Sequence, residues 1–515
     1  MTDATGAAAW AAVAACALAL LPAGSRWLRV AQREHYIADS TSRFAIRWWT
    51  AEPVDVLMGF AALAGVVLSG LWPLFALLTV GAAVTGPAHL SIRGRSSPLV
   101  LTRRLRSLAA VWLVLQGAII GIGAGLGVPA PFAAAGLVSV PALVDVALFL
   151  TAPVERRLSQ RFVTMAASRL ARVAPTVVAI TGSYGKTSTK NHIAHLVSGT
   201  KTVVASPASF NNRVGLARAV NEHLAEGTEV FVAEMGTYGP GEIRDLCGWC
   251  TPEIAVITAI GPVHLERFGT EDAILAAKSE ITERASVVVV NADDGRLAAL
   301  ATALATAAGG PSVVRCSAGD EAADVCVAAA DDAVRVIVNG QHVGPAVPVR
   351  HGVQLTNLAC AVAVALRLGV PPETVVSRVP TIPAVANRLT SDISSSGVYV
   401  IDDTFNSNPA GARAALAALA AAPGAGRRVV VTPGMVELGP RQASENESFA
   451  RTACETATDL VFVGMTNRRA LLAGATGLRP VVLVRTRQEA VDWVRANLGP
   501  GDAVLYENDL PDQYP

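Results

Sequence analysis

Residues 176–188 read TVVAITGSYGKTS, and they predict a strand, a glycine-rich turn and a helix in succession. The first six residues are apolar and rich in β-branched side chains, which is typical of a buried strand. The segment GSYGKTS follows at 182–188, and then a helix is expected through Val197. A glycine-rich turn between a strand and a helix lets backbone N–H groups approach a phosphate with no Cβ in the way. The stretch therefore predicts a phosphate-binding loop in an α/β sheet.

The side chains of this loop suit a bound nucleotide. Lys186 is expected to reach the β- and γ-phosphates of ATP, and the hydroxyl of Thr187 to hold Mg²⁺. Position 180 is isoleucine where the general phosphate loop has glycine, so the shorter form TGSYGKTS is the more specific signal. A glycine turn that binds no nucleotide is the weaker alternative. The residues expected to bind the nucleotide here are Gly182, Ser183, Gly185, Lys186, Thr187 and Ser188.

Units of strand, loop and helix repeat from Pro175 onward, and one of the strands ends in a carboxylate. Residues 230–236 read VFVAEMG, with Glu234 at the end of the apolar run. An open parallel sheet forms its ligand crevice at the C-terminal ends of its strands, and a carboxylate near Thr187 suits a hard Mg²⁺ ion. A lone glutamate at this place would more often be an exposed charge on the rim. Beside the phosphate loop, Glu234 is expected to bind the metal.

The first 154 residues carry most of the apolar excess of a chain that is 52% hydrophobic and 16% charged. Apolar stretches run at roughly 8–24, 53–70, 72–87, 108–128 and 131–153. A membrane span needs about 20 apolar residues, and arginines cluster at 26–47, 93–106 and 156–172. If the basic segments face the cytoplasm, the chain crosses five times with its N-terminus outside. We therefore expect a multi-pass anchor in the cytoplasmic membrane and catalytic domains in the cytoplasm.

Three details of this N-terminal region leave alternatives open. The stretches between Pro53 and Gly86 are short, so they form either a tight hairpin or one span with a re-entrant piece. Asp145 lies in the last stretch, where an ionisable group is either functional or paired for structure. Residues 155–174 are expected to form an amphipathic, arginine-bearing linker at the membrane surface.

Charge and cysteine content exclude some classes of function. The net charge of +1 gives no basic field for nucleic acid, so no such partner is expected. Seven cysteines are an odd number, which argues against a full disulfide framework. Cys247 and Cys250 form a C-G-W-C pair, but a zinc site needs four ligands. We interpret both as partly buried thiols on a helix.

Several motifs in a fixed order resemble the Mur ligases, and within them the enzymes that add D-Ala-D-Ala. Beyond the phosphate loop they are SFNN at 209–212, VFVAEMG at 230–236, VITAIGPVHLERFG at 256–269, AAKSEI at 276–281, NADD at 291–294, ANRL at 386–389, IDDTFNSNP at 401–409 and GMVELG at 434–439. The resemblance covers about 175–500. It implies a central ATP-binding domain with a parallel sheet over 175–385 and a Rossmann-like C-terminal domain over 386–515.

The resemblance also implies a second metal site. His264 would ligate a second Mg²⁺, and Lys278, on a helix that starts near Glu271, would be carbamylated into a carboxylate-like ligand. Asn211 would belong to the catalytic set. Alone, His264 would be read as a structural histidine and Lys278 as a solvated lysine. The chain has only four lysines, at 186, 190, 201 and 278, so a specific chemical need at this position is favoured.

Further positions are matched to the nucleotide and the incoming amine. By resemblance, Asn291 would lie near the adenine and Arg388 would reach the transferred phosphate. Asp403, Asn406 and Asn408 would close over the nucleotide and the amine. The alternative for these last three is a simple turn, since Asp, Asn and Pro are common turn formers.

The implied reaction is ATP-dependent amide formation. The γ-phosphate of ATP would pass to a carboxylate, and the amine of an amino acid or dipeptide would attack the acyl phosphate. Lys186, Arg388 and two Mg²⁺ ions would neutralise charge, and closure of the C-terminal domain would exclude water. The carboxylate is expected on a small molecule or on a lipid-linked precursor of the cell envelope.

The substrate positions depart from the family. Membrane stretches replace its small UDP-sugar-binding domain, Val353 stands where a histidine is usual, and the segment RQASENESFA after Gly439 lacks another histidine. The chain ends GDAVLYENDLPDQYP instead of with the family's lysine-glycine-serine. Amide ligation is therefore better supported than a UDP-MurNAc-tripeptide substrate. The alternatives are a ligase of a secondary-metabolite or poly-amino-acid pathway and a membrane scaffold that binds ATP without catalysis.

Overall fold

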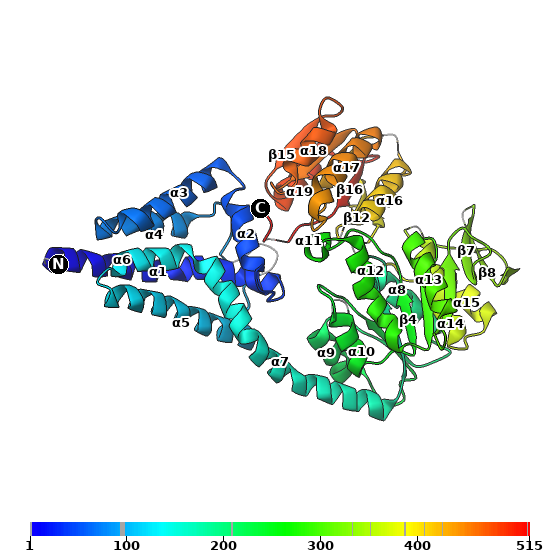
Figure 1. Ribbon diagram of the computed structural model, residues 1–515. Coiled ribbons are helices and arrows are strands. Elements are labelled where there is room, and N and C mark those ends of the chain that lie inside the picture. The colour runs from blue at the N-terminus through cyan, green and yellow to red at the C-terminus, as the bar shows by residue number, and fades with distance from the viewer. Residues whose placement is uncertain are drawn as a thin grey trace. The chain divides into compact units, whose positions relative to one another are not determined.

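The computed structural model describes residues 3–92, 98–207, 210–331, 333–350, 352–385, 388–405, 407–424, 426–511 and 513–515. These residues divide into two compact units (Figure 1). The first unit comprises Met1–Leu158, Gly464–Thr466 and Leu510–Pro515, and the second comprises Ser159–Val463 and Asn467–Asp509.

The first unit is helical. Its helices are α1 (Asp3–Arg33), α2 (Ser40–Trp49), α3 (Pro53–Leu68), α4 (Ala76–Thr85), α5 (Arg103–Gly125), α6 (Pro129–Val138) and the first part of α7 (Val140–Val173). Glycine lets neighbouring helices approach closely, because a Cβ at Gly24 would lie 2.3 Å from the Trp112 ring. Between α3 and α4, the Thr79 hydroxyl donates to the Ala62 carbonyl at 2.8 Å. The pair is therefore a packed hairpin, which was one of the two expected alternatives.

Two buried charged side chains in this unit satisfy the ends of other helices. The Asp145 carboxylate accepts from the backbone N–H groups of Thr41 and Ser42, at 3.2 and 2.8 Å, in the first turn of α2. The Arg26 guanidinium donates to the carbonyls of Ala83 and Val84, in the last turn of α4. Helix ends leave such backbone groups without partners, and charges of these signs suit them. The geometry favours a structural role for Asp145.

The expected five membrane crossings are wrong. Among the described residues, two helices, Ala4–Arg33 and Arg103–Gly125, have the length and composition of a membrane span. The number rises to at most four if each of two bent helix pairs is counted as one candidate. α3 has only 16 residues, a length of about 24 Å against the roughly 30 Å of a hydrocarbon core. The expected linker over 155–174 belongs to α7, which continues to Val173. Residues 93–97, part of one basic segment, lie outside the described residues.

The second unit begins with a large, mainly parallel sheet. Its strands are β1 (Thr176–Thr181), β2 (Val203–Ala205), β3 (Val230–Glu234), β4 (Ile254–Ile257), β5 (Val287–Asn291), β6 (Ser312–Ser317), β7 (Val325–Ala330), β8 (Ala333–Val338), β9 (Gln341–His342) and β10 (Val347–Pro348). The order is β10-β8-β7-β6-β5-β4-β1-β3-β2, with β9 beside β8. The pairs from β2 to β7 are parallel, and β8 pairs antiparallel with β7, β9 and β10.

Helices cover both faces of this sheet, so its parallel strands are buried on both sides. One core joins the sheet to α8 (Lys186–Val197), α14 (Leu355–Arg367) and α15 (Pro372–Arg378). The other core joins it to the end of α7 and to α9 (Arg213–His223), α10 (Glu242–Trp249), α11 (Leu265–Phe268), α12 (Glu271–Ser279) and α13 (Gly295–Thr306). Cys247 and Cys250 are free thiols in this second core, and burial raises the pKa of Cys247 to about 12.

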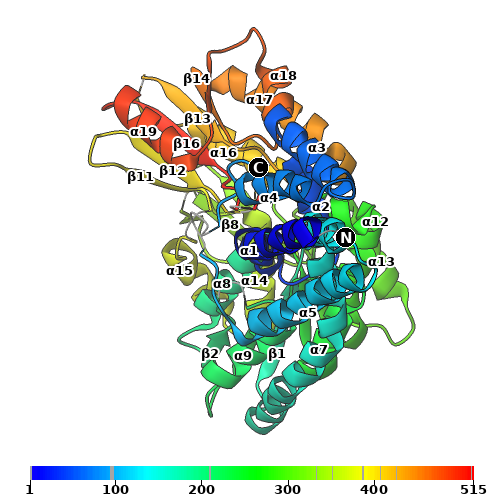
Figure 2. The same cartoon turned by 90° about the vertical axis from the view of Figure 1, so that its left-hand side faces the viewer.

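A second sheet forms the C-terminal part (Figure 2). Its strands are β11 (Thr390–Ile393), β12 (Tyr399–Asp403), β13 (Arg428–Thr432), β14 (Asp459–Val463), β15 (Val481–Val484) and β16 (Ala503–Glu507), in the order β11-β12-β16-β13-β14-β15. Only the β11–β12 pair is antiparallel. α16 (Pro409–Ala420), α17 (Gln442–Thr456) and α18 (Arg468–Ala475) pack on one face, and α19 (Arg487–Asn497) packs on the other. The predicted α/β class with parallel sheets is confirmed.

Candidate functional site

The turn between β1 and α8 has the backbone of a phosphate-binding loop. Gly182 and Gly185 have φ angles of 150° and 81°. A Cβ at Gly182 would lie 2.0 Å from the Thr258 hydroxyl, and one at Gly185 would lie 2.3 Å from the Asn357 side chain. α8 begins at Lys186 with no side-chain cap, so its first N–H groups are available to an anion. The loop therefore fits the phosphates of a nucleotide.

Ser183 fixes this loop to the segment after β4. Its backbone N–H donates to the Ala259 carbonyl at 2.8 Å. Its hydroxyl donates to the Gly261 carbonyl at 3.1 Å and accepts from the Gly261 N–H at 3.0 Å. The hydroxyl of Ser183 is thus engaged in holding the loop, and phosphate contact would come through the backbone.

Glu234 lies next to the loop, as the strand ends predict. It accepts from the Thr187 hydroxyl at 3.0 Å, from the Lys190 ammonium at 3.0 Å and from the Asn211 amide at 3.3 Å. Burial opposes the ionisation of Glu234, but the Lys190 and Lys186 cations outweigh it and lower the pKa of the carboxyl. A carboxylate and a hydroxyl side by side, next to a phosphate loop, are donors that suit Mg²⁺.

Lys190 also belongs to this cluster. In the sequence it stands out only as one of four lysines in the chain, and no role is predicted for it. Its side chain is 2% exposed, and its only ion pair among the described residues is with Glu234. A buried carboxylate needs such a partner, so Lys190 keeps Glu234 charged before any metal arrives.

Lys278 lies on α12 as expected, with its side chain 2% exposed. Within the described ranges, no hydrogen bond or ion pair reaches its nitrogen. Burial and the neighbouring Lys186 charge lower the pKa of Lys278 well below its ordinary value. Both effects favour the neutral amine, because a buried ammonium group loses its hydration and is repelled by the Lys186 charge.

His264 lies at the start of α11 and contacts the C-terminal part, which contains the second sheet. Its Nδ1 forms a short contact with the Glu437 carboxylate, and its ring meets Tyr238 edge-on at 5.0 Å. In the part of the chain that the structure describes, no three His, Cys, Asp or Glu side chains converge on a metal position. In addition to Glu234 and His264, the two predicted metal sites would therefore need Thr187, a modified Lys278 and nucleotide oxygens.

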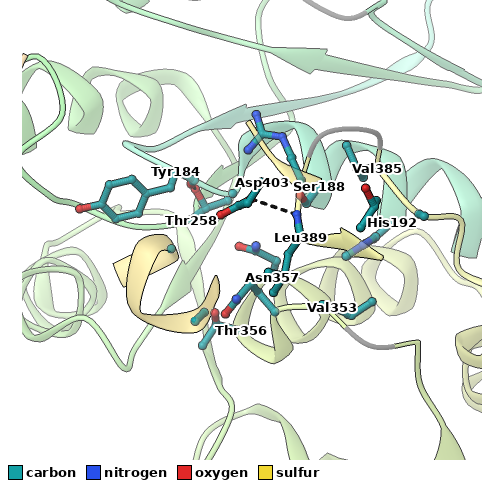
Figure 3. A pocket seen from close by; sticks show the side chains of 18 of the residues that line it. Tyr184, Ser188, His192, Thr258, Val353, Thr356, Asn357, Val385, Leu389 and Asp403 are labelled. Atoms are coloured by element: carbon teal, nitrogen blue, oxygen red, sulfur yellow. Dashed lines mark hydrogen bonds between the residues drawn. The ribbon is translucent and has the colours of Figure 1, made fainter. Parts of the chain in front are cut away.

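One cavity of about 660 Å³ brings both halves of the second unit together (Figure 3). From the first sheet and its helices it is lined by Gly185, Ser188, Asn291 and Asn357, and from the C-terminal part by Arg388, Asp403 and Asn408. This volume is in the range of small-ligand sites. Five of the predicted nucleotide residues thus share one cavity, namely Gly185, Ser188, Asn291, Arg388 and Asp403, whereas Gly182, Ser183, Lys186 and Thr187 are not among its lining residues.

Within the cavity, several predicted residues already have protein partners. Asn291 donates to the Thr258 carbonyl at 3.0 Å and accepts from the Asp293 N–H at 3.0 Å. Asp403 accepts from the Leu389 N–H at 2.9 Å, and burial raises the pKa of its carboxyl to about 6. Asn408 caps α16, and Arg388 stacks on the Phe405 ring at 4.7 Å. Asn406, Asn387 and Ser209 lie outside the described residues.

Glu507 ends β16, between the ends of β12 and β13. It is fully buried and accepts from the hydroxyls of Ser407 and Thr432. Burial raises the pKa of Glu507 from 4.5 to about 7, against the effect of both hydroxyls. The carboxyl is thus more readily protonated in the folded chain than in the unfolded chain.

We predict that Glu507→Gln stabilises the protein at pH 8 and not at pH 5. Because the folded pKa lies above the unfolded value, the stabilising proton is fully present below pH 4.5 and is lost as pH rises through 7. The wild type then carries a buried charge that costs roughly 3 kcal/mol at most, and glutamine carries none. Thermal unfolding at both pH values measures this, with Glu447→Gln, a partly exposed carboxylate that pairs with Arg451, as control. An equal shift at both pH values would contradict the prediction.

Comparisons with known proteins identify the family. A profile for the Mur ligase middle domain matches residues 180–365, and one for the Mur ligase glutamate ligase domain matches residues 388–506. The UDP-N-acetylmuramoyl-tripeptide–D-alanyl-D-alanine ligase of Mycobacterium tuberculosis is 34% identical over 376 residues, which cover 67% of this chain and 72% of that protein. The chain belongs to the Mur ligase family.

Solved structures agree with this assignment. MurF from Acinetobacter baumannii is 26% identical, with a TM-score of 0.60 over 68% of this Mur ligase and 77% of that chain. MurF from Thermotoga maritima, solved with ADP, shares the fold at 22% identity and a TM-score of 0.58 over 68% and 80% of the two chains. This Mur ligase is an ATP-dependent, ADP-forming ligase, and its family typically uses Mg²⁺.

The expected multi-pass location of this Mur ligase in the cytoplasmic membrane is wrong. The described helices do not supply the five spans, and the similar ligases are named for a UDP-linked substrate, not a lipid-linked one. The prediction of five spans used only the apolar composition of each stretch, which does not show what its side chains contact. Part of the apolar surface in the first unit packs helix against helix, as at Gly24 and Trp112, while many of its large apolar side chains are exposed.

Proposed function

We propose that this Mur ligase joins the amine of D-Ala-D-Ala to a carboxyl group of a UDP-linked muramoyl tripeptide. The observation that carries the proposal is the single cavity in which the phosphate loop, through Gly185, meets Arg388 and Asp403 of the C-terminal part. The name of the relative that is 34% identical supplies the substrates.

The protein groups suit transfer of the γ-phosphate to a carboxylate. Lys186 and Arg388 would neutralise the phosphoryl oxygens in the transition state. The substrate carboxylate attacks the γ-phosphorus, ADP leaves, and the acyl phosphate forms. The amine then attacks the acyl carbon, loses a proton and expels inorganic phosphate. The burial of Arg388 and Asp403 within the cavity supports exclusion of water during these steps.

The proposal includes two Mg²⁺ positions. Thr187 and Glu234 would hold one ion, and His264 with a carbamylated Lys278 would hold the other. Bound Mg²⁺ would neutralise phosphate charge. Carbamylation of Lys278 is supported by its buried nitrogen, which has no hydrogen bond or ion pair among the described residues, and by the nearby Lys186 charge, which an anion there would offset.

The test uses the full-length protein with ATP, Mg²⁺, UDP-MurNAc-tripeptide and D-Ala-D-Ala. Mass spectrometry of the product and measurement of ADP and phosphate are expected to show one added dipeptide per ATP. Thr187→Val, which keeps the shape of the side chain but removes the hydroxyl, is the matched inactive variant. ADP formed only with a secondary-pathway or lipid-linked carboxylate would overturn the substrate assignment. ATP binding with no ligation of any carboxylate would favour the scaffold alternative.

A further inference from the structure

The contact between His264 and Glu437 joins two loops that each follow a parallel strand. His264 lies after β4 and Glu437 lies after β13, in the C-terminal part. Beside the contact of their side chains, the backbone N–H of Glu266 donates to the Glu437 carbonyl at 3.4 Å. A Cβ on Gly439 would lie 3.2 Å from the Glu266 nitrogen. The two loops therefore pack backbone against backbone at this contact.

Both residues of the pair have a left-handed backbone conformation. The φ angle is 64° at His264 and 64° at Glu437, in a region that residues with a Cβ seldom adopt. Such a conformation costs free energy and persists where surrounding contacts enforce it, often at functional sites. Glycine would remove the strain but would supply neither the imidazole nor the carboxylate. Strain on both sides of one contact therefore indicates that these two side chains have a function there.

The contact determines which nitrogen of the imidazole is left for a ligand. An ionised carboxylate only accepts hydrogen bonds, so Nδ1 of His264 carries the proton and donates to Glu437. The other nitrogen, Nε2, then holds a lone pair, and it makes no hydrogen bond within the described part of the chain. Histidines that bind metals commonly donate their second ring N–H to a carboxylate, which fixes the tautomer and the orientation of the ring. His264 has this arrangement.

Two neighbours hold the pair in place. Arg267, three residues after His264, lies 3.8 Å from the second carboxylate oxygen of Glu437. The Arg267 guanidinium stacks on the Tyr238 ring at 4.9 Å, and that ring meets the imidazole edge-on at 5.0 Å. The carboxylate thus has a cation on the side away from the histidine, and the imidazole is held by a hydrogen bond and a ring contact.

We propose that Glu437 is a positioning residue that orients His264 toward Mg²⁺, so that the second metal site is complete only when the C-terminal part contacts α11. The inference rests on the proposed role of His264 as a metal ligand. The other residues proposed to bind Mg²⁺, namely Thr187, Glu234 and Lys278, all come from the first sheet and its helices. Glu437 is the contribution of the C-terminal part, and it makes binding of the second ion depend on contact between the two parts.

The experiment measures equilibrium binding of Mn²⁺, a paramagnetic substitute for Mg²⁺, to the full-length protein with ADP by electron paramagnetic resonance. Glu437→Ala is expected to weaken binding of the second ion by about 10- to 100-fold, the typical effect of removing the partner of a metal-binding histidine. Glu437→Gln, whose side-chain oxygen still accepts from Nδ1, is expected to recover most of this loss. Glu437→Gly, which suits the left-handed backbone, replaces the alanine variant if that variant does not fold.

Arg441→Ala is the matched control for contact between the two parts. Arg441 lies on the same segment as Glu437 and donates to Glu271, at the start of α12, at 2.7 Å. This half-exposed ion pair also joins the C-terminal part to the helices of the first sheet, but it does not involve His264. Its loss should change the affinity of the second ion by no more than about threefold, as for other exposed ion pairs.

A double-mutant cycle tests whether Glu437 acts through His264. In the His264→Ala background, Glu437→Ala should cause no further loss of metal affinity, because effects that pass through one shared contact are not additive. Additive losses overturn the role of Glu437, and so does an equal loss in Arg441→Ala. A wild type that binds two Mn²⁺ ions but ligates no substrate would overturn the proposed substrates and leave this inference standing. Ligation by a wild type that binds only one ion would overturn this inference alone.

Discussion

Lys186→Ala is expected to lower kcat for ADP formation by about 100- to 1,000-fold, the typical effect of removing one donor to a transition-state charge. The ammonium donates to the Gly182 carbonyl at 2.6 Å and lies within 3.5 Å of the Ser183 carbonyl. It is thus held over the loop where the phosphates would lie. Without it, those carbonyls would face the phosphate oxygens unscreened.

The stability of the variant is expected to change little. Burial lowers the pKa of Lys186, and Arg388 adds to this effect while Glu234 opposes it. Removing this poorly solvated charge also relieves Lys278, whose pKa Lys186 depresses. Steady-state kinetics of Lys186→Ala should therefore show a large loss of kcat, while thermal unfolding should show a nearly unchanged Tm.

Two control variants bracket this result. Lys201→Ala removes another of the four lysines, one that pairs with Glu229 at 3.5 Å on the surface, and should keep full activity. Lys186→Arg keeps the charge but not the compact ammonium, and should recover only part of kcat. If Lys186→Ala stays within about threefold of the wild type, the nucleotide site is misassigned.

The elements that carry the nucleotide were predictable because their signals are local. β1 has the bounds that the β-branched run predicts, and α8 ends at Val197 as predicted but already begins at Lys186, inside the expected loop segment. The contact between Glu234 and Thr187 was also predictable, since parallel strands end at one edge of a sheet. Periodicity and glycine placement thus suffice for the core of the site.

The sequence could not predict features that depend on contacts between distant residues, or on whether an apolar stretch packs against protein or spans a membrane. His264 and Glu437 are 173 residues apart and meet only through the fold. The apolar stretches before residue 154 resembled five spans, but the two between Pro53 and Gly86 form helices of only 16 and 10 residues, with a 3₁₀ turn at Pro73–Phe75 between them. Composition alone does not indicate where a helix ends.

Lys278→Ala is expected to lower kcat for ADP formation by about 100- to 1,000-fold, and millimolar acetate is expected to restore part of the loss. The side chain is buried, has no partner within the described residues and stands near the Lys186 charge. A neutral amine attacks CO₂, forms an N–C bond and releases a proton, which leaves a carbamate anion. The anion would pair with Lys186 and provide an oxygen ligand for Mg²⁺.

A free amine and a carbamate predict different results at this position. If the carbamate acts, ¹³C-labelled CO₂ gives a carbamate resonance in the wild type that Lys278→Ala lacks, and Lys278→Glu keeps more activity than the alanine variant. If the amine itself acts, neither acetate nor glutamate helps, because both add negative charge where an amine is needed. Acetate should leave the wild type and Lys201→Ala unchanged, which separates a filled cavity from a general salt effect. Burying an amine beside Lys186 without such a modification would leave two like charges or one unsatisfied nitrogen, and both are costly.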